Sequence, residues 1–138
     1  MSIELIDVNA QASRYKAIVH LWHSLKERTP DQSISHIKMP TIQQHRDFVL
    51  TKPHPHWYLI RIAGTNTYIG NVYMTDRREI GIHIDNAHRG KGYGSAALKA
   101  LREICPGHLL ANINPANSAS IEFFKKHGAT LLQHTYKL

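Results

Sequence analysis

The sequence lacks the features of a membrane-spanning, disulfide-rich or repetitive chain. It contains one cysteine, Cys105, so no disulfide can form within the chain. No apolar run approaches the roughly 18 residues that a membrane-spanning helix requires. The first residues also lack the basic and apolar regions of a signal peptide. We therefore expect a single domain over residues 1–138, in the cytoplasm and with no membrane partner.

Acidic residues are scarce relative to basic ones. The 17 Lys and Arg residues outnumber the 10 Asp and Glu residues, giving a formal net charge of +7. This balance favours anionic partners such as phosphorylated cofactors. The basic residues are dispersed, with only short pairs such as Arg77-Arg78, and form no stripe typical of a nucleic-acid groove. We expect no nucleic-acid partner.

Histidines are plentiful, at eleven, but those nearest one another in the sequence form no recognisable metal motif. His45, His54 and His56 match no compact ligand set with Cys or Asp. The sequence therefore predicts no metal ion.

Composition and periodicity predict an alternation of strands and helices. Strands are expected at residues 3–8, 57–62, 68–75, 79–85, 108–112 and 131–138. Helices are expected at residues 12–28 and 42–51, from the glycines near residue 94 to Pro106, and at 114–127. This order predicts an α+β fold, with a mixed, mostly antiparallel sheet and about four helices, and not a doubly wound fold.

Several helices carry signals for their buried faces and their ends. In the helix at 12–28 the expected inward stripe is Tyr15, Ile18, Val19, Trp22 and Leu25. In the helix at 42–51 it is Ile42, His45, Phe48 and Val49. Thr41 and Gln44 have the spacing of a capping box. Asn114, followed by proline, is expected to begin the helix at 114–127.

A glycine-rich segment, Arg89 to Gly94, lies between an alternating strand and a well-patterned helix. A helix N-terminus presents unpaired N–H groups and about half a positive charge, and glycines let an anion approach them. Arg89 and Lys91 add full charges, so the segment is typical of a pyrophosphate site. It matches neither a Walker A loop nor the Gly-x-Gly-x-x-Gly dinucleotide fingerprint. A glycine-rich turn without a ligand is the alternative.

The chain resembles the GNAT N-acetyltransferase superfamily in two motifs. The coenzyme A motif Arg/Gln-x-x-Gly-x-Gly/Ala is matched by Arg89, Gly92 and Gly94. The second signature has an asparagine, a Ser or Ala three residues on, an aromatic pair and a glycine; it is matched by Asn117, Ser120, Phe123, Phe124 and Gly128. Ala129 replaces the usual phenylalanine. The order of elements also matches along nearly the whole chain.

The resemblance implies acetyl-CoA as cosubstrate, bound where the sheet splays between its fourth and fifth strands. The residues expected to bind it are Ile82, His83, Ile84, Arg89, Gly90, Lys91, Gly92, Tyr93, Gly94, Ser95, Asn117, Phe123 and Phe124. Backbone groups of residues 82–84 are expected to pair with the pantetheine arm, and one N–H to polarise the thioester carbonyl.

The resemblance also implies direct attack on the thioester by a neutral amine, which requires a base. Glu79 and His83 are the candidates, because both lie on the polar face of the strand at 79–85. Alternatively, Glu79 pairs with an arginine and His83 is an ordinary hydrogen-bonded sheet residue. Phe124 occupies the position at which many relatives carry a tyrosine that acts as the general acid. Either Tyr136 or Tyr73 takes this role here, or the thiolate leaves unassisted.

The acceptor is expected to be a primary amine on a small molecule or peptide, such as an amino sugar or another small metabolite. The loop at 29–40 is a candidate wall for it. A homodimer is common among such proteins. The loss of tyrosine at Phe124 supports an alternative, a catalytically silent acyl-CoA-binding regulatory domain. A nucleic-acid-binding module, supported only by the charge, ranks last.

Overall fold

The central element is a five-stranded sheet in which strand order follows chain order. The computed structural model describes residues 2–10, 12, 14–29, 32 and 38–138. The strands are β1 (Ile3–Asp7), β2 (His56–Ile62), β3 (Tyr68–Met74), β4 (Glu79–Ile84) and β5 (Leu110–Ala111). Neighbours from β1 to β4 are antiparallel, whereas β5 is parallel to β4. The predicted α+β class with a mixed sheet is confirmed.

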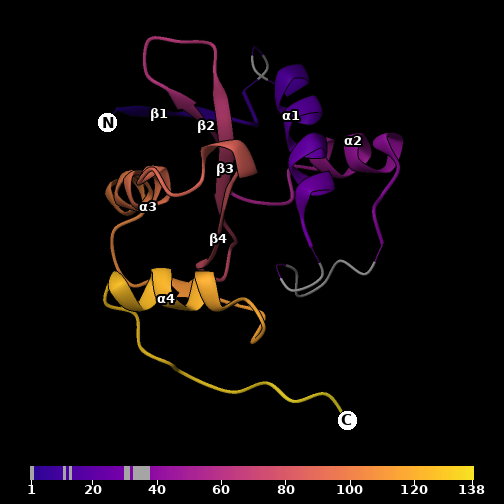
Figure 1. Cartoon of the computed structure of the whole chain (residues 1–138). Helices are drawn as coiled ribbons and strands as arrows, with labels where there is room; N and C mark the ends of the chain where they lie inside the picture. The colour runs from indigo at the N-terminus through magenta and orange to yellow at the C-terminus, as the bar shows by residue number, and fades with distance from the viewer. Residues whose placement is uncertain (1, 11, 13, 30–31, 33–37) are drawn as a thin grey trace.

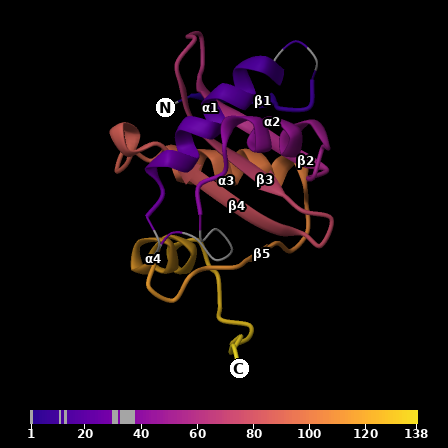
Figure 2. The same cartoon turned by 90° about the vertical axis from the view of Figure 1, so that its right-hand side faces the viewer.

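Helices cover both faces of this sheet. The helices are α1 (Arg14–Glu27), α2 (Ile42–Leu50), α3 (Tyr93–Ile104) and α4 (Ser118–Lys126), with a short 3-10 helix η2 (Asn86–His88). Helices α1 and α2 lie on one face and α3 on the other, while α4 lies near β5 (Figures 1 and 2). Each face has its own buried core. No helix in the described ranges is long and apolar enough to cross a membrane.

The buried face of α1 differs from the predicted stripe. The residues buried in α1 are Ala17, Ile18, Leu21 and Ser24, whereas Tyr15 is 80% exposed. Apolar residues occur on more than one side of this helix, so its pattern allows several rotations about the axis. Packing on the sheet selects the side with small residues, and this rotation turns polar α1 side chains toward β4.

Helix α2 begins as predicted, although its buried face is narrower. Thr41 and Gln44 form the reciprocal capping box. His45 and Val49 are buried, but Ile42 and Phe48 are about half exposed, at 48% and 49%. The helix therefore contributes a thin stripe to the core it shares with α1.

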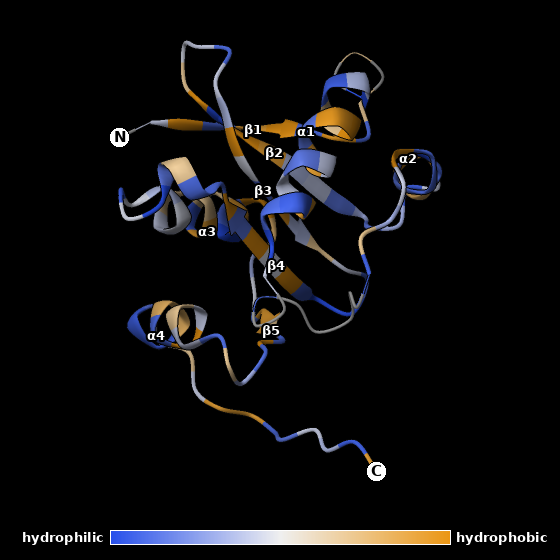
Figure 3. Ribbon diagram, turned by 45° about the vertical axis from the view of Figure 1, so that its right-hand side comes forward, coloured by the Kyte–Doolittle hydropathy of each residue, from blue (hydrophilic) through white to orange (hydrophobic). Residues whose placement is uncertain are grey.

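The C-terminal third of the chain differs most from the prediction. Helix α4 is capped by Asn117, whose side chain accepts from Ser120 N–H, whereas Asn114 forms a preceding turn. The strand predicted at 131–138 is wrong: this segment has no strand pairing and leads away from the sheet (Figure 3). The strand at 108–112 is reduced to two residues. A segment with a strand pattern forms a strand only where a neighbouring strand supplies hydrogen-bond partners. The two-residue β5 supplies almost no such partners to residues 131–138.

Gly70 allows β3 and β4 to approach closely. The β2–β3 register shifts beside it, between Ile60 and Arg61, as at a β-bulge. A methyl group on Gly70 would overlap the carbonyl oxygen of His83. Because that atom belongs to the backbone of β4, no rotamer change can relieve the overlap. The glycine therefore helps to fix the position of His83.

Replacing this glycine should destabilise the fold. We expect Gly70→Ala to lower the free energy of unfolding by about 1–3 kcal/mol, the usual cost of forcing bulk into a packed site, as measured by urea denaturation. Gly94→Ala is the matched control, because its added carbon would meet Phe123 at an ordinary 3.6 Å and alanine favours a helix. Equal destabilisation by both variants would contradict this account.

Candidate functional site

Strand β4 loses its outer neighbour part-way along its length. β5 pairs only with Glu79 and Ile80. The Asp85 N–H donates a hydrogen bond to the Ile69 carbonyl at 2.8 Å. Because backbone groups of successive strand residues point to opposite sides, this bond identifies which residues of β4 face β3. Residues 81 and 83 therefore direct their backbone groups toward β3, and residues 82 and 84 direct theirs toward the gap beyond β5.

This alternation separates His83 from its two neighbours. His83 is paired with Asn71 in the β3–β4 ladder, so it contributes its side chain and not its backbone. Ile82 and Ile84 present backbone groups to the gap, and the Ile84 carbonyl accepts a 3.0 Å hydrogen bond from Arg89 Nε. Of the three strand residues predicted to bind the acyl carrier, these two have the required orientation.

The glycine segment forms an open N-terminus for α3. Gly92 is the N-cap, with φ of +85°, and Gly90 has φ of +75°. Glycine adopts this left-handed region without strain. No side chain caps the helix, and Ala96 N–H makes a 3.2 Å bond to the Gly92 carbonyl. A side chain added at either glycine would meet no atom within 4 Å, so the N–H groups are accessible.

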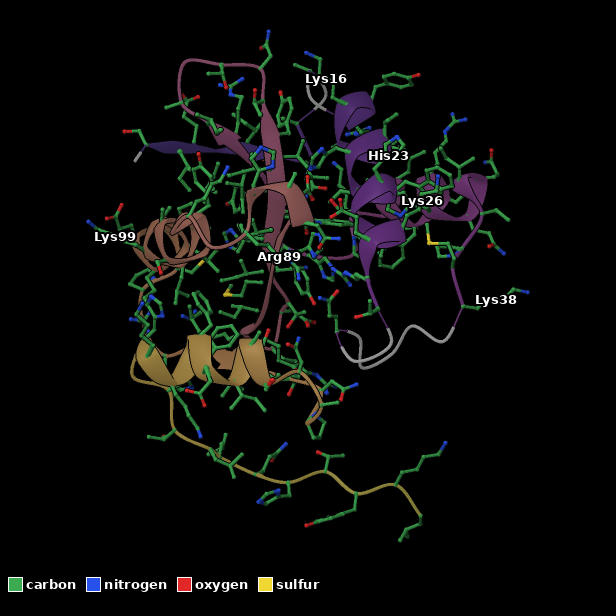
Figure 4. The ribbon with its side chains drawn as sticks, in the orientation of Figure 1. Lys16, His23, Lys26, Lys38, Arg89 and Lys99 are labelled. Atoms are coloured by element: carbon green, nitrogen blue, oxygen red, sulfur yellow. The ribbon has the colours of Figure 1, made fainter. Side chains whose placement is uncertain are left out.

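The two sequence motifs meet at this helix end. A carbon added to Gly94 would contact Phe123 at 3.6 Å and Ile84 at 3.8 Å, so β4, α3 and α4 converge there. Phe123 and Phe124 pack edge to face, with ring centroids 5.0 Å apart. The other residues predicted here, Lys91, Tyr93 and Ser95, follow in the same segment, and Figure 4 shows Arg89 where the chain passes from β4 to α3.

A polar cluster lies on the other face of β4, against α1. His83 Nε2 is 3.5 Å from a carboxylate oxygen of Glu27 and 3.5 Å from one of Asp85. His20 Nε2 lies 3.4 Å from the other oxygen of Asp85. Ser24 donates a 2.9 Å hydrogen bond to Asp85. The His83 side chain is only 7% exposed, whereas that of Glu27 is 34% exposed, so a buried imidazole lies between two carboxylates of which one reaches solvent.

The charges in this cluster affect one another. Burial alone would raise the pKa of the Asp85 carboxyl, but the nearby imidazoles of His83 and His20 and the hydroxyl of Ser24 together lower that pKa. Burial lowers the pKa of His20, despite the opposing effect of Asp85. At neutral pH the cluster therefore combines an ionised Asp85 with a neutral His20.

The other predicted proton-transfer residues lie in different surroundings. Glu79 accepts a hydrogen bond from Asn112, so its partner is an amide and not an arginine. Tyr73 packs its ring where a side chain at Gly81 would lie, on the same face of β4 as His83. Tyr136 is 82% exposed, and it belongs to the C-terminal segment, which leads away from the sheet (Figure 1).

Sequence reasoning missed the partners of His83. His20, Ser24 and Glu27 follow a spacing of four and three residues along α1, which puts them on one helical face. His83 and Asp85 are two apart, as residues on one face of a strand are. Each spacing is visible in the sequence, but neither indicates that the two faces meet. Most of the loop at 29–40, predicted as an acceptor wall, lies outside the described residues.

Comparison with families agrees with this geometry. The acetyltransferase (GNAT) family model matches residues 18–129. Among curated proteins, the chain is 38% identical over 66 residues to YwnH of Bacillus subtilis (strain 168), named as a putative phosphinothricin acetyltransferase. That match spans 45% of this chain and only 40% of YwnH.

Solved structures share the fold across most of the chain. An acetyltransferase from Thermus thermophilus superposes with a TM-score of 0.70 at 17% identity, over 93% of this chain and 86% of that one. The putative acetyltransferase yncA of Salmonella typhimurium, solved with its cofactor acetyl-CoA, gives 0.64 at 19% identity, over 93% and 78%.

Proposed function

The chain belongs to the acetyltransferase (GNAT) family, and we propose that it is an N-acetyltransferase that moves the acetyl group of acetyl-CoA to a primary amine on a small molecule. One observation carries the proposal: the uncapped N-terminus of α3 and the backbone groups of Ile82 and Ile84 lie at the same opening beside β4. The His83 side chain lies on the face of the same strand that packs against α1, and we place the acceptor on that side.

The residues present fit the acyl carrier. The backbone from Gly90 to Ser95 lies at the positive end of a helix with open space beside Gly90 and Gly92, which suits a pyrophosphate. The Ile82 and Ile84 backbone groups, which face the gap, suit an extended amide-containing arm. Asn117, Phe123 and Phe124 line the side formed by α4. An N–H of Ile82 or Ile84 is the candidate donor to stabilise negative charge on a thioester oxygen.

His83 is the favoured base. An alkyl ammonium has a pKa near 10, so it must lose a proton before its nitrogen attacks. Nε2 of His83 can accept that proton, and the carboxylates of Glu27 and Asp85 stabilise the resulting imidazolium. As the new C–N bond forms, the C–S bond breaks. Glu79, bonded to Asn112, is the second candidate.

Departure of the thiolate needs little help. A thiol has a pKa of about 8.5, so its anion is a tolerable leaving group. Phe124 cannot donate a proton. Tyr73 packs over Gly81 of β4, and it replaces the usual tyrosine if an acid is used. Tyr136 would require the C-terminal segment to move.

The acceptor class is the first matter to test. We expect release of thiol from acetyl-CoA with at least one of a set of primary amines: amino sugars, amino acids including phosphinothricin, polyamines and short peptides. The name of YwnH supports including the amino acids. Tight acetyl-CoA binding without turnover on any amine would favour the alternative, a silent regulatory domain that the phenylalanine at position 124 also suits.

The glycine segment can be tested independently of turnover. We expect Gly92→Glu to abolish acetyl-CoA binding in calorimetry, because the new carboxylate would occupy the anion site. Gly64→Glu is the matched control: Gly64 has φ of +75° and equally open surroundings in the β2–β3 turn. Both variants carry the same backbone strain, so unchanged binding in a folded Gly92→Glu protein would refute this site.

The base can be identified by comparing two substitutions. We expect His83→Gln to lower kcat by about 100- to 10,000-fold, the usual contribution of a general base, while acetyl-CoA affinity is retained. Glu79→Gln should lose much less. A larger loss of kcat in Glu79→Gln than in His83→Gln would assign the role of base to Glu79. Full activity in both variants would exclude both residues as the base.

A further inference from the structure

A proton shared between an imidazole and a carboxylate does not explain the distances in the cluster around His83. His83 Nε2 is buried without a hydrogen-bond partner, although two carboxylate oxygens lie 3.5 Å away. His20 Nε2 is in the same state beside Asp85. A donated hydrogen bond would shorten one of these distances to about 2.8 Å. Nε2 of His83 instead lies at the same distance, 3.5 Å, from one oxygen of each carboxylate.

We propose that Glu27, His83 and Asp85 form a binding site for a divalent transition-metal ion of the zinc class. Ligand atoms from these three residues all lie within 4.8 Å of one another. Zinc bonds of about 2.1 Å in a tetrahedron put ligand atoms about 3.4 Å apart. The two measured separations from His83, both 3.5 Å, match that edge.

The negative charges of the cluster favour binding of such a cation. The carboxylates of Glu27 and Asp85 both approach His83, and among the described residues only imidazoles form ion pairs with them. A divalent cation would neutralise the pair. Imidazole with carboxylate suits Zn²⁺ and neighbouring transition metals, whereas Mg²⁺ prefers oxygen ligands alone.

Surrounding groups already hold the ligands in position. Ser24 Oγ donates to Asp85 at 2.9 Å, and the Asn86 N–H donates to Glu27 at 3.0 Å. Such outer contacts orient metal ligands and tune their basicity. Three protein ligands leave a fourth position of the tetrahedron for a water.

Occupation of this site has a consequence for catalysis. The ion takes the Nε2 lone pair that His83 would use as a base, so Zn²⁺ inhibits acetyl transfer. This consequence rests on the proposed function, whereas binding of the ion does not.

The binding test uses the full chain freed of metal with a chelator. We expect Zn²⁺ to bind in calorimetry with one site that Mg²⁺ does not fill, and Co²⁺ to give the visible absorption of a tetrahedral complex. Glu27→Gln and Asp85→Asn should each weaken this site by more than about tenfold, because even outer partners of metal ligands contribute that much. His108→Gln, an exposed histidine outside the cluster, is the control for surface binding.

Binding that persists in both carboxamide variants, or that is lost equally in His108→Gln, would overturn the site, as would no binding at all. Inhibition is measured by mass spectrometry of the acetylated amine. An assay of released thiol is unsuitable, because Zn²⁺ also binds that thiol. Site-specific binding with undiminished transfer would support the metal site and remove His83 as base. Transfer without site-specific binding would refute the metal site and leave the acetyltransferase proposal intact.

Discussion

The hydrogen-bond ladder between β3 and β4 determines what each residue of β4 can do. Its alternation directs the backbone of Ile82 and Ile84 toward the gap beyond β5 and the side chains of His83 and Asp85 toward α1. A slip of one residue would exchange these roles completely. The close approach at Gly70 opposes such a slip. The proposed anion site and the polar cluster therefore both depend on the register of a single strand.

The two ends of α3 differ in capping, and the uncapped end is the one beside β4. At its C-terminal end the Arg78 guanidinium donates to the carbonyl of the C-cap residue Cys105 and to the carbonyls of Pro106 and His108 in the turn that follows, so the cap carbonyl is satisfied. At its N-terminal end Gly92 supplies no capping side chain. Unsatisfied donors and the positive end of the dipole thus remain where the chain offers glycines and room for an anion.

The polar cluster has a physical requirement that more than one cation can meet. Two carboxylates beside a buried imidazole stabilise positive charge at Nε2 of His83, whether it arrives as a proton from an amine or as a metal ion. These uses exclude each other because they share one lone pair. With His83 as the proposed base, metal availability would control acetyl transfer, and Glu27 of α1 takes part in both arrangements.

Local signals in the sequence determined the hairpin of β2 and β3, the alternation of β4, the capping box at Thr41 and the glycine N-terminus of α3, because each depends on residues a few positions apart. They also indicated His83 as a base candidate. The rotation of α1, the shortness of β5, the unpaired C-terminal segment and the meeting of Glu27 with His83 were decided only by the tertiary structure. The apolar pattern of α1 permits several rotations, and packing against strands more than 50 residues away selects the one that turns His20, Ser24 and Glu27 toward β4.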